Sequence, residues 1–291
     1  MLPWRGAATP RASLGCPPVT WYEAIVYGIV QGLTEFLPIS SSGHLLLVPA
    51  FFGWEDPGAL FTAIIQLGTM LAVVLYFWRD LIAVVTTWVR SWYTPSLRSE
   101  LNARMGWYLV IGTIPIVIFG FIFRNQIETA ARSLYIVGTM LIVFGLILGA
   151  IDWASRKERV VESVKRNDAI AVGFAQALAL IPGVSRSGAT ISAGLLMGLT
   201  REAAARFSFL LSIPAIVLSG LYGLYGELGS SSGGVGLLPL IIATVVSFIV
   251  GYAAIAFLLR WLARHSLYVF VVYRVILGVL VLALAAGGAI S

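Results

Sequence analysis

Charged residues are scarce in this sequence. Asp, Glu, Lys and Arg make up 11% of its 291 residues, whereas a soluble globular domain has about a quarter. Cysteine is nearly absent, since Cys16 is the only one, which excludes an internal disulfide and any cysteine metal cluster. Residues 1–20 lack the continuous apolar core of a signal peptide. We expect them to form a disordered N-terminal tail.

Hydrophobic residues make up 59% of the chain and fall in long blocks. Each of six blocks is long enough to cross a hydrocarbon layer of ~30 Å as a helix. Only one of them carries a charged residue, Arg274. Helices satisfy their own backbone polar groups in lipid, so we predict an all-α polytopic membrane protein. The blocks are Leu60–Trp78, Trp107–Phe123, Leu134–Ile151, Phe207–Gly226, Gly236–Leu259 and Leu267–Gly288.

Residues 24–53 recur at 169–198, at an offset of 145 residues without gaps. Nine of the thirty aligned positions are identical, and self-similarity at a fixed offset indicates a duplication. The identical pairs are Ala24/Ala169, Ile25/Ile170, Gly28/Gly173, Gln31/Gln176, Leu33/Leu178, Ser40/Ser185, Ser42/Ser187, Gly43/Gly188 and Gly53/Gly198.

Both copies have a short apolar helix, a break rich in Pro, Ser and Gly, and a second short apolar helix. The breaks lie at Pro38–Gly43 and Pro182–Gly188. Neither arm can span, so each copy predicts a re-entrant hairpin; the alternative is one kinked spanning helix. With three spanning helices after each hairpin, the halves form an inverted-topology repeat whose hairpins meet near the midplane. We therefore predict a single membrane domain, 21–291, with repeats at about 21–152 and 167–291.

The basic residues orient this arrangement. Thirteen lie in loops on one predicted side and four on the other, and the positive-inside rule places the richer side in the cytoplasm. Both termini and the mouth of the first hairpin then face outward. Topology and anionic lipids explain the net charge of +6 better than nucleic acid does. The richer side holds Arg79, Arg90, Arg98, Arg104, Arg156, Lys157, Arg159, Lys165, Arg166, Arg201, Arg206, Arg260 and Arg264; the other holds Arg5, Arg11, Arg124 and Arg132.

Ionisable residues inside the membrane indicate function, and the two hairpins carry Glu35, His44 and Arg186. Gln31 shares a helix face with Glu35. Serine hydroxyls, a guanidinium and the start of a short helix together suit a phosphate. The candidate phosphate-binding residues in and beside the turns are Gln31, Ser40, Ser41, Ser42, Ser185, Ser187 and Thr190.

The two copies differ where reactive groups stand. Glu35, Ser41 and His44 of the first align with Leu180, Arg186 and Ala189 of the second. The scaffold positions are alike while the reactive ones have diverged. This difference predicts one asymmetric site between the halves.

Each residue also has a structural interpretation. The serines and glycines could serve close packing, His44 could be a hydrogen-bonded structural residue, and Glu35 with Arg186 could be only a buried ion pair. Arg274 is expected to snorkel to the cytoplasmic interface. Three acidic residues are expected to be solvated loop charges: Asp152, Glu158 and Glu162.

Two motifs carry a resemblance to a known family: QGLTEFLPISSSGH at Gln31–His44 and PGVSRSGAT at Pro182–Thr190. The chain, over about residues 21–290, resembles the undecaprenyl-diphosphate phosphatases, a family also linked to bacitracin resistance. The resemblance implies a bacterial inner-membrane enzyme that hydrolyses undecaprenyl diphosphate to the monophosphate and recycles the cell-wall carrier lipid. It also implies dependence on Mg²⁺ or Ca²⁺. Many members have Glu where this chain has Gln31, which argues against a two-carboxylate metal site.

On this basis Arg186 would stabilise the phosphorus-centred transition state, and Glu35 would hold the cation or act as general base. The nucleophile stays open between His44, Ser41 and water. A lipid-phosphate flippase or small-anion transporter is the rival function, because inverted repeats with broken helices also build transporters. A non-catalytic assembly subunit would leave the polar residues without a purpose. Glycines in the spanning segments would permit a homodimer.

Overall fold

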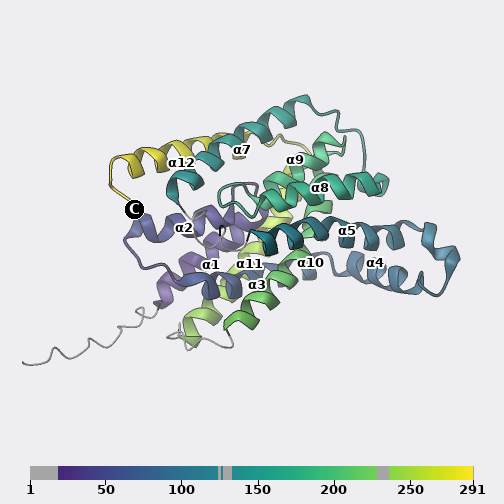
Figure 1. The fold of residues 1–291 in the computed structure, drawn as a ribbon, viewed down its shortest axis with the longest axis horizontal. Helices are drawn as coiled ribbons and strands as arrows, with labels where there is room; N and C mark the ends of the chain where they lie inside the picture. Colours follow the sequence, from purple (N-terminus) through teal and green to yellow (C-terminus); the bar gives the residue numbers. More distant parts are fainter. Residues whose placement is uncertain (1–18, 124–125, 127–132, 228–235, 291) are drawn as a thin grey trace, which may run out of the picture.

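The computed structural model describes residues 19–123, 126, 133–227 and 236–290 (Figure 1). Within these ranges the chain is helical, and its only β-type pairing is an isolated bridge between Arg159 and Leu199. The predictions for Cys16, Arg5, Arg11, Arg124 and Arg132, and for most of the tail, lie outside the described residues. The helices are α1 (Trp21–Phe36), α2 (Ser41–Phe52), α3 (Gly58–Tyr76), α4 (Trp78–Arg90), η1 (Pro95–Ser99), α5 (Leu101–Ile122), α7 (Leu134–Ala154), η3 (Val161–Ser163), α8 (Arg166–Leu178), α9 (Arg186–Leu196), α10 (Arg201–Glu227), α11 (Leu237–Leu262) and α12 (Tyr268–Ala286).

The long apolar blocks of the sequence are helices α3, α5, α7, α10, α11 and α12. By length and composition, four of these (α5, α7, α11 and α12) can each cross a membrane, and α3 with α4 makes a fifth candidate bent by 79°. The protein is therefore an all-helical, multi-pass membrane protein.

Helix α4 contains Arg79 and Arg90, which we expected to lie in a loop. Trp88 of α4 packs closely on α5. A Cβ added at Gly106 of α5 would lie 2.5 Å from the indole ring. Ile82 and Val85 are exposed on α4. The prediction was wrong because the segment is too charged to score as a spanning block, although its apolar residues recur at helical spacing.

The four short helices leave the chain broken where the sequence predicts. The arms α1 and α2 have 16 and 12 residues, and α8 and α9 have 13 and 11. At about 1.5 Å per residue even the longest arm is shorter than a hydrocarbon layer of ~30 Å. Within each copy the arms contact one another, and α1 also packs on α11 while α8 packs on α5.

The same glycine lets the first arm of each copy approach its neighbour. A Cβ at Gly28 would lie 2.7 Å from the carbonyl oxygen of Ala243 in α11, and one at Gly173 would lie 2.6 Å from that of Gly112 in α5. Both approaches require glycine, because any side chain at these positions would clash, as in tightly packed membrane helices. The identical pair Gly28/Gly173 therefore has one packing role in both copies.

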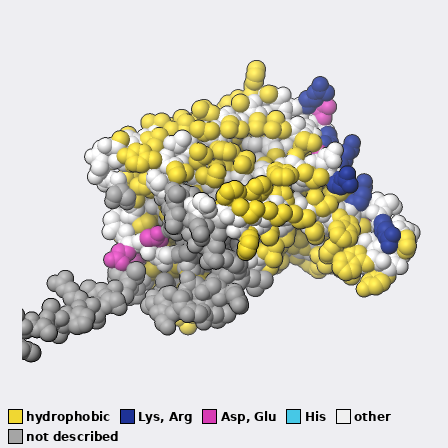
Figure 2. Space-filling model, viewed as in Figure 1, with side chains coloured by type: hydrophobic (Ala, Val, Ile, Leu, Met, Phe, Trp, Pro, Cys, Tyr) yellow, Lys and Arg dark blue, Asp and Glu magenta, His cyan; other side chains and the backbone are white. Residues whose placement is uncertain are grey.

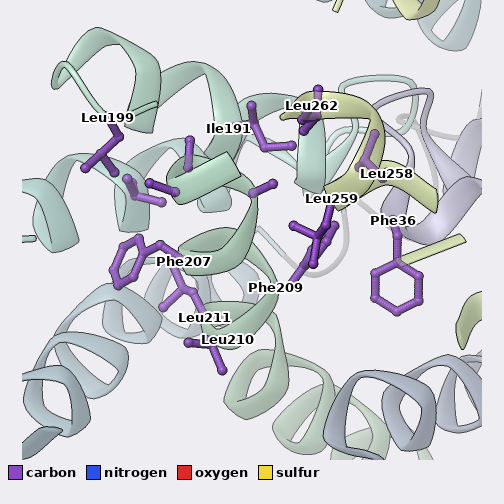
Figure 3. Packing of buried hydrophobic residues seen from close by; sticks show 14 of the residues in the cluster. Phe36, Ile191, Leu199, Phe207, Phe209, Leu210, Leu211, Leu258, Leu259 and Leu262 are labelled. Atoms are coloured by element: carbon purple, nitrogen blue, oxygen red, sulfur yellow. The ribbon is translucent and has the colours of Figure 1, made fainter. Parts of the chain in front are cut away.

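A hydrophobic core anchors the end of α1 beside the first break (Figure 3). Phe36, directly after Glu35, is buried and meets Phe209 of α10 edge-on, with ring centroids 5.3 Å apart. Leu258 and Ile191 belong to the same core. This packing fixes the backbone from which Glu35 projects.

Basic side chains gather at one end of the molecule, over the outer ends of α4, α5, α7 and α8 (Figure 2). Asp152 lies there too, but it is not the solvated loop charge that we expected. It is 1% exposed, accepts a hydrogen bond from Arg201 at 2.6 Å, and accepts the Leu267 N–H at 3.0 Å. The expectation failed because Arg201 at the start of α10 and the backbone just before α12 both bind this carboxylate at the end of α7. Glu158 and Glu162 are exposed as expected.

Nearby, Arg159 ties the loop before α8 to the end of α9. Its guanidinium binds the Asp168 carboxylate at 2.6 Å and the Met197 carbonyl oxygen at 2.7 Å. The hydrogen bond to Asp168 raises the pKa of Arg159 above its ordinary value. The second hairpin is thus fastened at its basic end by an ion pair.

Candidate active site

The two broken loops lie against one another. Ser187, from the second loop, donates a hydrogen bond to the carbonyl oxygen of Leu37, in the first, at 3.0 Å. Arg186 forms an ion pair with Glu35. The predicted meeting of the Glu35 segment and the Arg186 segment is therefore present in the structure, although 151 residues separate them.

The carboxylate of Glu35 is the centre of the polar cluster. Its side chain is 3% exposed and receives donors from three directions. Glu35 Oε2 accepts from Gln31 Nε2 at 3.1 Å and from Ser41 Oγ at 2.7 Å. Arg186 binds the other carboxylate oxygen, Oε1. Because an ionised carboxylate only accepts hydrogen bonds, Ser41 must donate its hydroxyl proton toward Glu35. This is the arrangement of a hydroxyl group beside a base.

The serine turns have the same backbone geometry in both copies. Ser40 and Ser185 have φ values of 78° and 75°, in the left-handed region that favours glycine. Each caps the helix that follows, because its hydroxyl accepts the N–H of Gly43 or Gly188 at 3.3 and 3.1 Å. Holding two non-glycine residues there costs of order 1–3 kcal/mol each. The packing of the loops must offset that strain.

These turns place Ser41 and Arg186 at equivalent positions, each the first residue of a helix. Helix N-termini carry partial positive charge and free N–H groups, so both helices begin with a favourable environment for an anion. Ser41 and Arg186 therefore have equivalent backbone positions but different side-chain chemistry.

Two cavities open on the cluster and share Glu35, Ser41 and Ser42. The first, about 500 Å³, is bounded largely by apolar side chains of α5 and α10 and also by Ser185 and Arg186. The second, about 340 Å³, is lined by Gln31 of α1 and Gln66 of α3 as well as by apolar residues such as Leu45, and we call it the polar cavity. The apolar wall of the first cavity comprises Ile116, Val117, Gly120, Phe121, Ala179, Leu180, Ala215 and Leu218.

His44 lies apart from these cavities. Its Nδ1 is 2.7 Å from the carbonyl oxygen of Ser40, and its Nε2 is 2.7 Å from the hydroxyl of Tyr273 in α12. The two rings are stacked at an interplanar angle of 6°. A carbonyl only accepts, so Nδ1 carries the proton and Nε2 accepts from the tyrosine. Neither ring nitrogen faces Glu35 or Ser41.

Three other predicted binding residues support the turns instead of lining the cavities. Ser40 and Ser187 are buried and make the cap and inter-loop contacts described above. Thr190 donates to the Arg186 carbonyl oxygen at 2.7 Å and lies within hydrogen-bond distance of Ser208. Gln31, Ser42 and Ser185 line the cavities.

Arg274 does not snorkel to an interface, so that expectation is wrong. Its side chain is 0% exposed and lies between the two loops. Carbonyl oxygens freed at the two breaks, together with two of helix α7, solvate the guanidinium inside the protein. The carbonyl groups within 3.3 Å of it belong to Pro38, Met140, Leu141, Gly183 and Val184.

Comparison with known proteins identifies the family. The family model described as bacitracin resistance protein BacA matches residues 24–280, which include both loops and Arg274. The chain belongs to the BacA family. It is 51% identical over 276 residues to the undecaprenyl-diphosphatase of Pseudarthrobacter chlorophenolicus, covering 94% of this chain and 100% of that protein. It is 50% identical to the undecaprenyl-diphosphatases of a Nocardioides strain and of Mycolicibacterium smegmatis, covering 94% of this chain and 99% of each.

In this BacA-family chain the sequence analysis missed two polar residues of α3. Gln66 lines both cavities beside Glu35. Thr69 is buried, and its hydroxyl lies 3.3 Å from Gln31 Nε2. Both are uncharged residues inside the block Leu60–Trp78, which was considered only as a spanning segment. Their signal was polarity within an apolar run.

The described residues contain no group of three or more His, Cys, Asp or Glu that could hold a metal ion. Glu35 is the carboxylate at the cluster, and Asp56 lines the polar cavity. One carboxylate fits a divalent cation only if substrate oxygens and water supply the other ligands, as is common for Mg²⁺. A cation held by protein ligands alone does not fit this site.

Proposed function

We propose that this chain is an integral-membrane hydrolase that converts undecaprenyl diphosphate and water into undecaprenyl phosphate and inorganic phosphate. The observation that carries the proposal is the Glu35–Ser41–Arg186 cluster at the end of an apolar cavity. The family relationship, with about half of the residues identical to three undecaprenyl-diphosphatases, supports the same substrate. Such an enzyme recycles the carrier lipid of cell-wall synthesis.

Ser41 is the nucleophile in this proposal. Its hydroxyl already donates to Glu35 at 2.7 Å, within the distance expected of a nucleophile and its base. As Oγ bonds to the terminal phosphorus, its proton passes to Glu35. The bond between that phosphorus and the bridging oxygen breaks, and undecaprenyl phosphate leaves. The product of this half-reaction is a phosphoserine.

Water completes the reaction. The proton on Glu35 passes to water in the polar cavity, which Glu35 also lines. The restored carboxylate then accepts a proton from a water molecule that attacks the phosphoserine. The P–Oγ bond breaks, inorganic phosphate is released, and Ser41 recovers its proton.

Arg186 stabilises the charge that develops on the terminal phosphate. Its guanidinium has five N–H donors, of which the ion pair with Glu35 engages one nitrogen. The remaining donors, with the N-termini of α2 and α9, provide a preorganised positive environment, from which most phosphoryl-transfer catalysis arises. When the diphosphate binds, Arg186 exchanges part of its contact with Glu35 for phosphate oxygens.

His44 has a positioning role here. Its Nδ1–H holds the carbonyl of Ser40, whose positive φ sets the direction of the turn before Ser41. With Nε2 bound to Tyr273, a direct attack by His44 would require its ring to leave both partners. Attack by His44 or by water remains an outcome that the experiment below distinguishes.

The prenyl chain occupies the apolar cavity. About 500 Å³ can hold only the first isoprene units of a long chain, so the remainder extends into lipid between α5 and α10. A divalent cation would be held by Glu35 together with diphosphate oxygens, and it would supply charge neutralisation of the phosphates. The other groups at the phosphate belong to the protein.

The test is phosphate release by the purified protein in detergent, where no second compartment exists and transport yields no signal. Wild type should release phosphate, and Ser41→Ala, Glu35→Gln and Arg186→Gln should each lose at least about 100-fold. Ser212→Ala, which alters a buried serine outside the cavities, is the matched control. Activity in Arg186→Gln equal to wild type would overturn the proposal.

Rapid quenching with labelled diphosphate identifies the nucleophile. A label on Ser41 supports the mechanism above, and a label on His44 replaces Ser41 with the imidazole. The absence of any phosphoenzyme, even in a variant with slowed hydrolysis, would assign the attack to water.

The inverted topology belongs to this proposal as well. The repeat on which it rests is supported by the matching φ values at Ser40 and Ser185, the matching caps, and the matching approaches of Gly28 and Gly173. We place the basic end in the cytoplasm by the positive-inside rule. Labelling of Thr94→Cys, in a chain with Cys16→Ser, by a membrane-impermeant thiol reagent tests this orientation. The residue should react only when the cytoplasmic face is accessible.

A homodimer also remains a proposal. Several glycines of the spanning helices are used within the chain; for example, a Cβ at Gly278 would lie 2.7 Å from the carbonyl oxygen of Gly138. A dimer would instead use exposed apolar faces such as those of α11 and α12. Sedimentation of the purified protein in detergent measures its mass directly.

A further inference from the structure

A separate cavity of about 690 Å³ lies where α3 bends into α4. The starts of α4 and α10 and the end of α11 bound it, and none of its residues lines the two cavities at Glu35. We call it the bend cavity. The residues that matter below are Trp78, Arg79, Arg206, Tyr252, Leu259 and Arg260.

Positive charge in the bend cavity exceeds its internal compensation. Of its three arginines, Arg206 binds Asp80 at 2.7 Å and lies over the ring of Phe77. Within the part of the chain that the structure describes, no ion pair is formed by Arg79 or Arg260. Glu202 also lines the cavity, so the net lining charge is positive by one.

The cavity has the surroundings of a membrane interface. Trp78 and Tyr252 are exposed at its rim, and aromatic residues of this kind concentrate at the level of lipid headgroups. Helix α4 leaves the direction of α3 by 79° and exposes Ile82 and Val85.

We propose that the bend cavity binds the phosphate headgroup of an anionic phospholipid. Arg79 and Arg260 would bind the phosphate diester, as guanidinium groups do. The acyl chains would lie along α11 and contact Leu259 and Tyr252. Basic pockets between membrane helices on the cytoplasmic side are typical of such headgroup sites. A free phosphate ion carries the same kind of charge but has no acyl chain to contact Leu259 and Tyr252.

The experiment is native mass spectrometry of the full chain in detergent, titrated with phosphatidylglycerol or with phosphatidylcholine. Wild type should retain one phosphatidylglycerol in preference to phosphatidylcholine. The double variant Arg79→Gln/Arg260→Gln should bind phosphatidylglycerol at least about tenfold more weakly. The matched control Arg90→Gln/Arg264→Gln removes the same charge from exposed positions outside the cavity, and it should bind like wild type.

A second variant keeps the test valid if the double variant is unstable. Ala256→Trp fills the cavity without a change of charge and should also lose the lipid. Equal loss in the control pair, equal binding of phosphatidylcholine, or retention of the lipid by Ala256→Trp would overturn the proposal. Displacement of the lipid by inorganic phosphate at millimolar concentration would make this a free-anion site and would also overturn it. None of these outcomes depends on phosphatase activity.

Discussion

Arg274 Nη1 donates a hydrogen bond at 3.2 Å to the carbonyl oxygen of Pro38, a residue 236 positions earlier in the sequence. The same guanidinium binds the carbonyl oxygens of Gly183 and Val184 at 2.9 Å. One side chain of the last helix therefore holds both breaks. Its positive charge also lies directly behind α9, since a Cβ at Gly188 would be 2.9 Å from Nη1.

Replacement of Arg274 should therefore disrupt stability and activity together. Arg274→Met leaves carbonyl groups of both loops without donors, at about 1–3 kcal/mol for each buried unsatisfied group. We expect a clear fall in Tm and a loss of at least about 100-fold in kcat/KM. Arg274→Lys keeps the charge with fewer donors and should lie between. The exposed Arg264→Lys is the control; a normal Tm for Arg274→Met would contradict this account.

Local sequence patterns were sufficient to predict the two breaks, whereas contacts between distant residues were not predictable. The duplication predicted both breaks and paired Ser40 with Ser185, because backbone geometry depends on local Pro, Ser and Gly. Glu35 and Arg186 were found because ionisable residues are rare in segments that enter the membrane. Partners distant in the sequence were not predictable in this way. Arg274 was misjudged because its carbonyl partners belong to three other segments.

Helical spacing also does not predict where the imidazole ring of His44 points. His44 follows Ser41 by one turn and was grouped with it, yet its imidazole reaches Tyr273 on α12. Gln66 was overlooked because only charged residues were sought inside the apolar blocks, although its polarity is unusual in such a run. Which face of α3 meets the loops depends on packing between helices.

Amide substitutions of His44 should distinguish its two ring nitrogens. His44→Asn places an N–H donor near the position of Nδ1 and can still bind the Ser40 carbonyl, whereas His44→Gln places its amide near Nε2. If His44 positions the turn, Asn should retain activity within about tenfold while Gln loses about 100-fold. The kcat of each variant, at saturating substrate, measures this. The reverse order would assign chemistry to Nε2.

Tyr273→Phe complements that pair, because it removes the hydroxyl at Nε2 and keeps the stacked ring. The Nδ1–H contact with Ser40 remains, so we expect a loss of less than about tenfold in kcat and an unchanged KM. A loss as large as that of His44→Gln would mean that the tyrosine, not the Ser40 carbonyl, is the important partner of the imidazole.

Gln31→Glu should change the response to divalent cations. Gln31 is buried and donates to Glu35 at 3.1 Å, so a carboxylate there replaces a donor by a second negative charge. Two adjacent carboxylates repel unless a cation lies between them. We expect low activity with chelator and a larger stimulation by Mg²⁺ than in wild type. Gln31→Leu, which removes the donor without adding charge, should lose activity with no increase in stimulation.

Substitution of Gly120 should separate the prenyl chain from the phosphate chemistry. A Cβ at Gly120 meets only Leu180 Cδ2, at 3.8 Å, so a larger side chain can be accommodated there and extends into the apolar cavity. Gly120→Leu should raise KM for the 55-carbon substrate about tenfold, a loss within the range expected for a few displaced methylene groups. The kcat with farnesyl diphosphate, whose chain is much shorter, should change little. Ile118→Phe adds bulk to an exposed position of the same helix and is the control. An equal loss for both substrates would place the prenyl chain elsewhere.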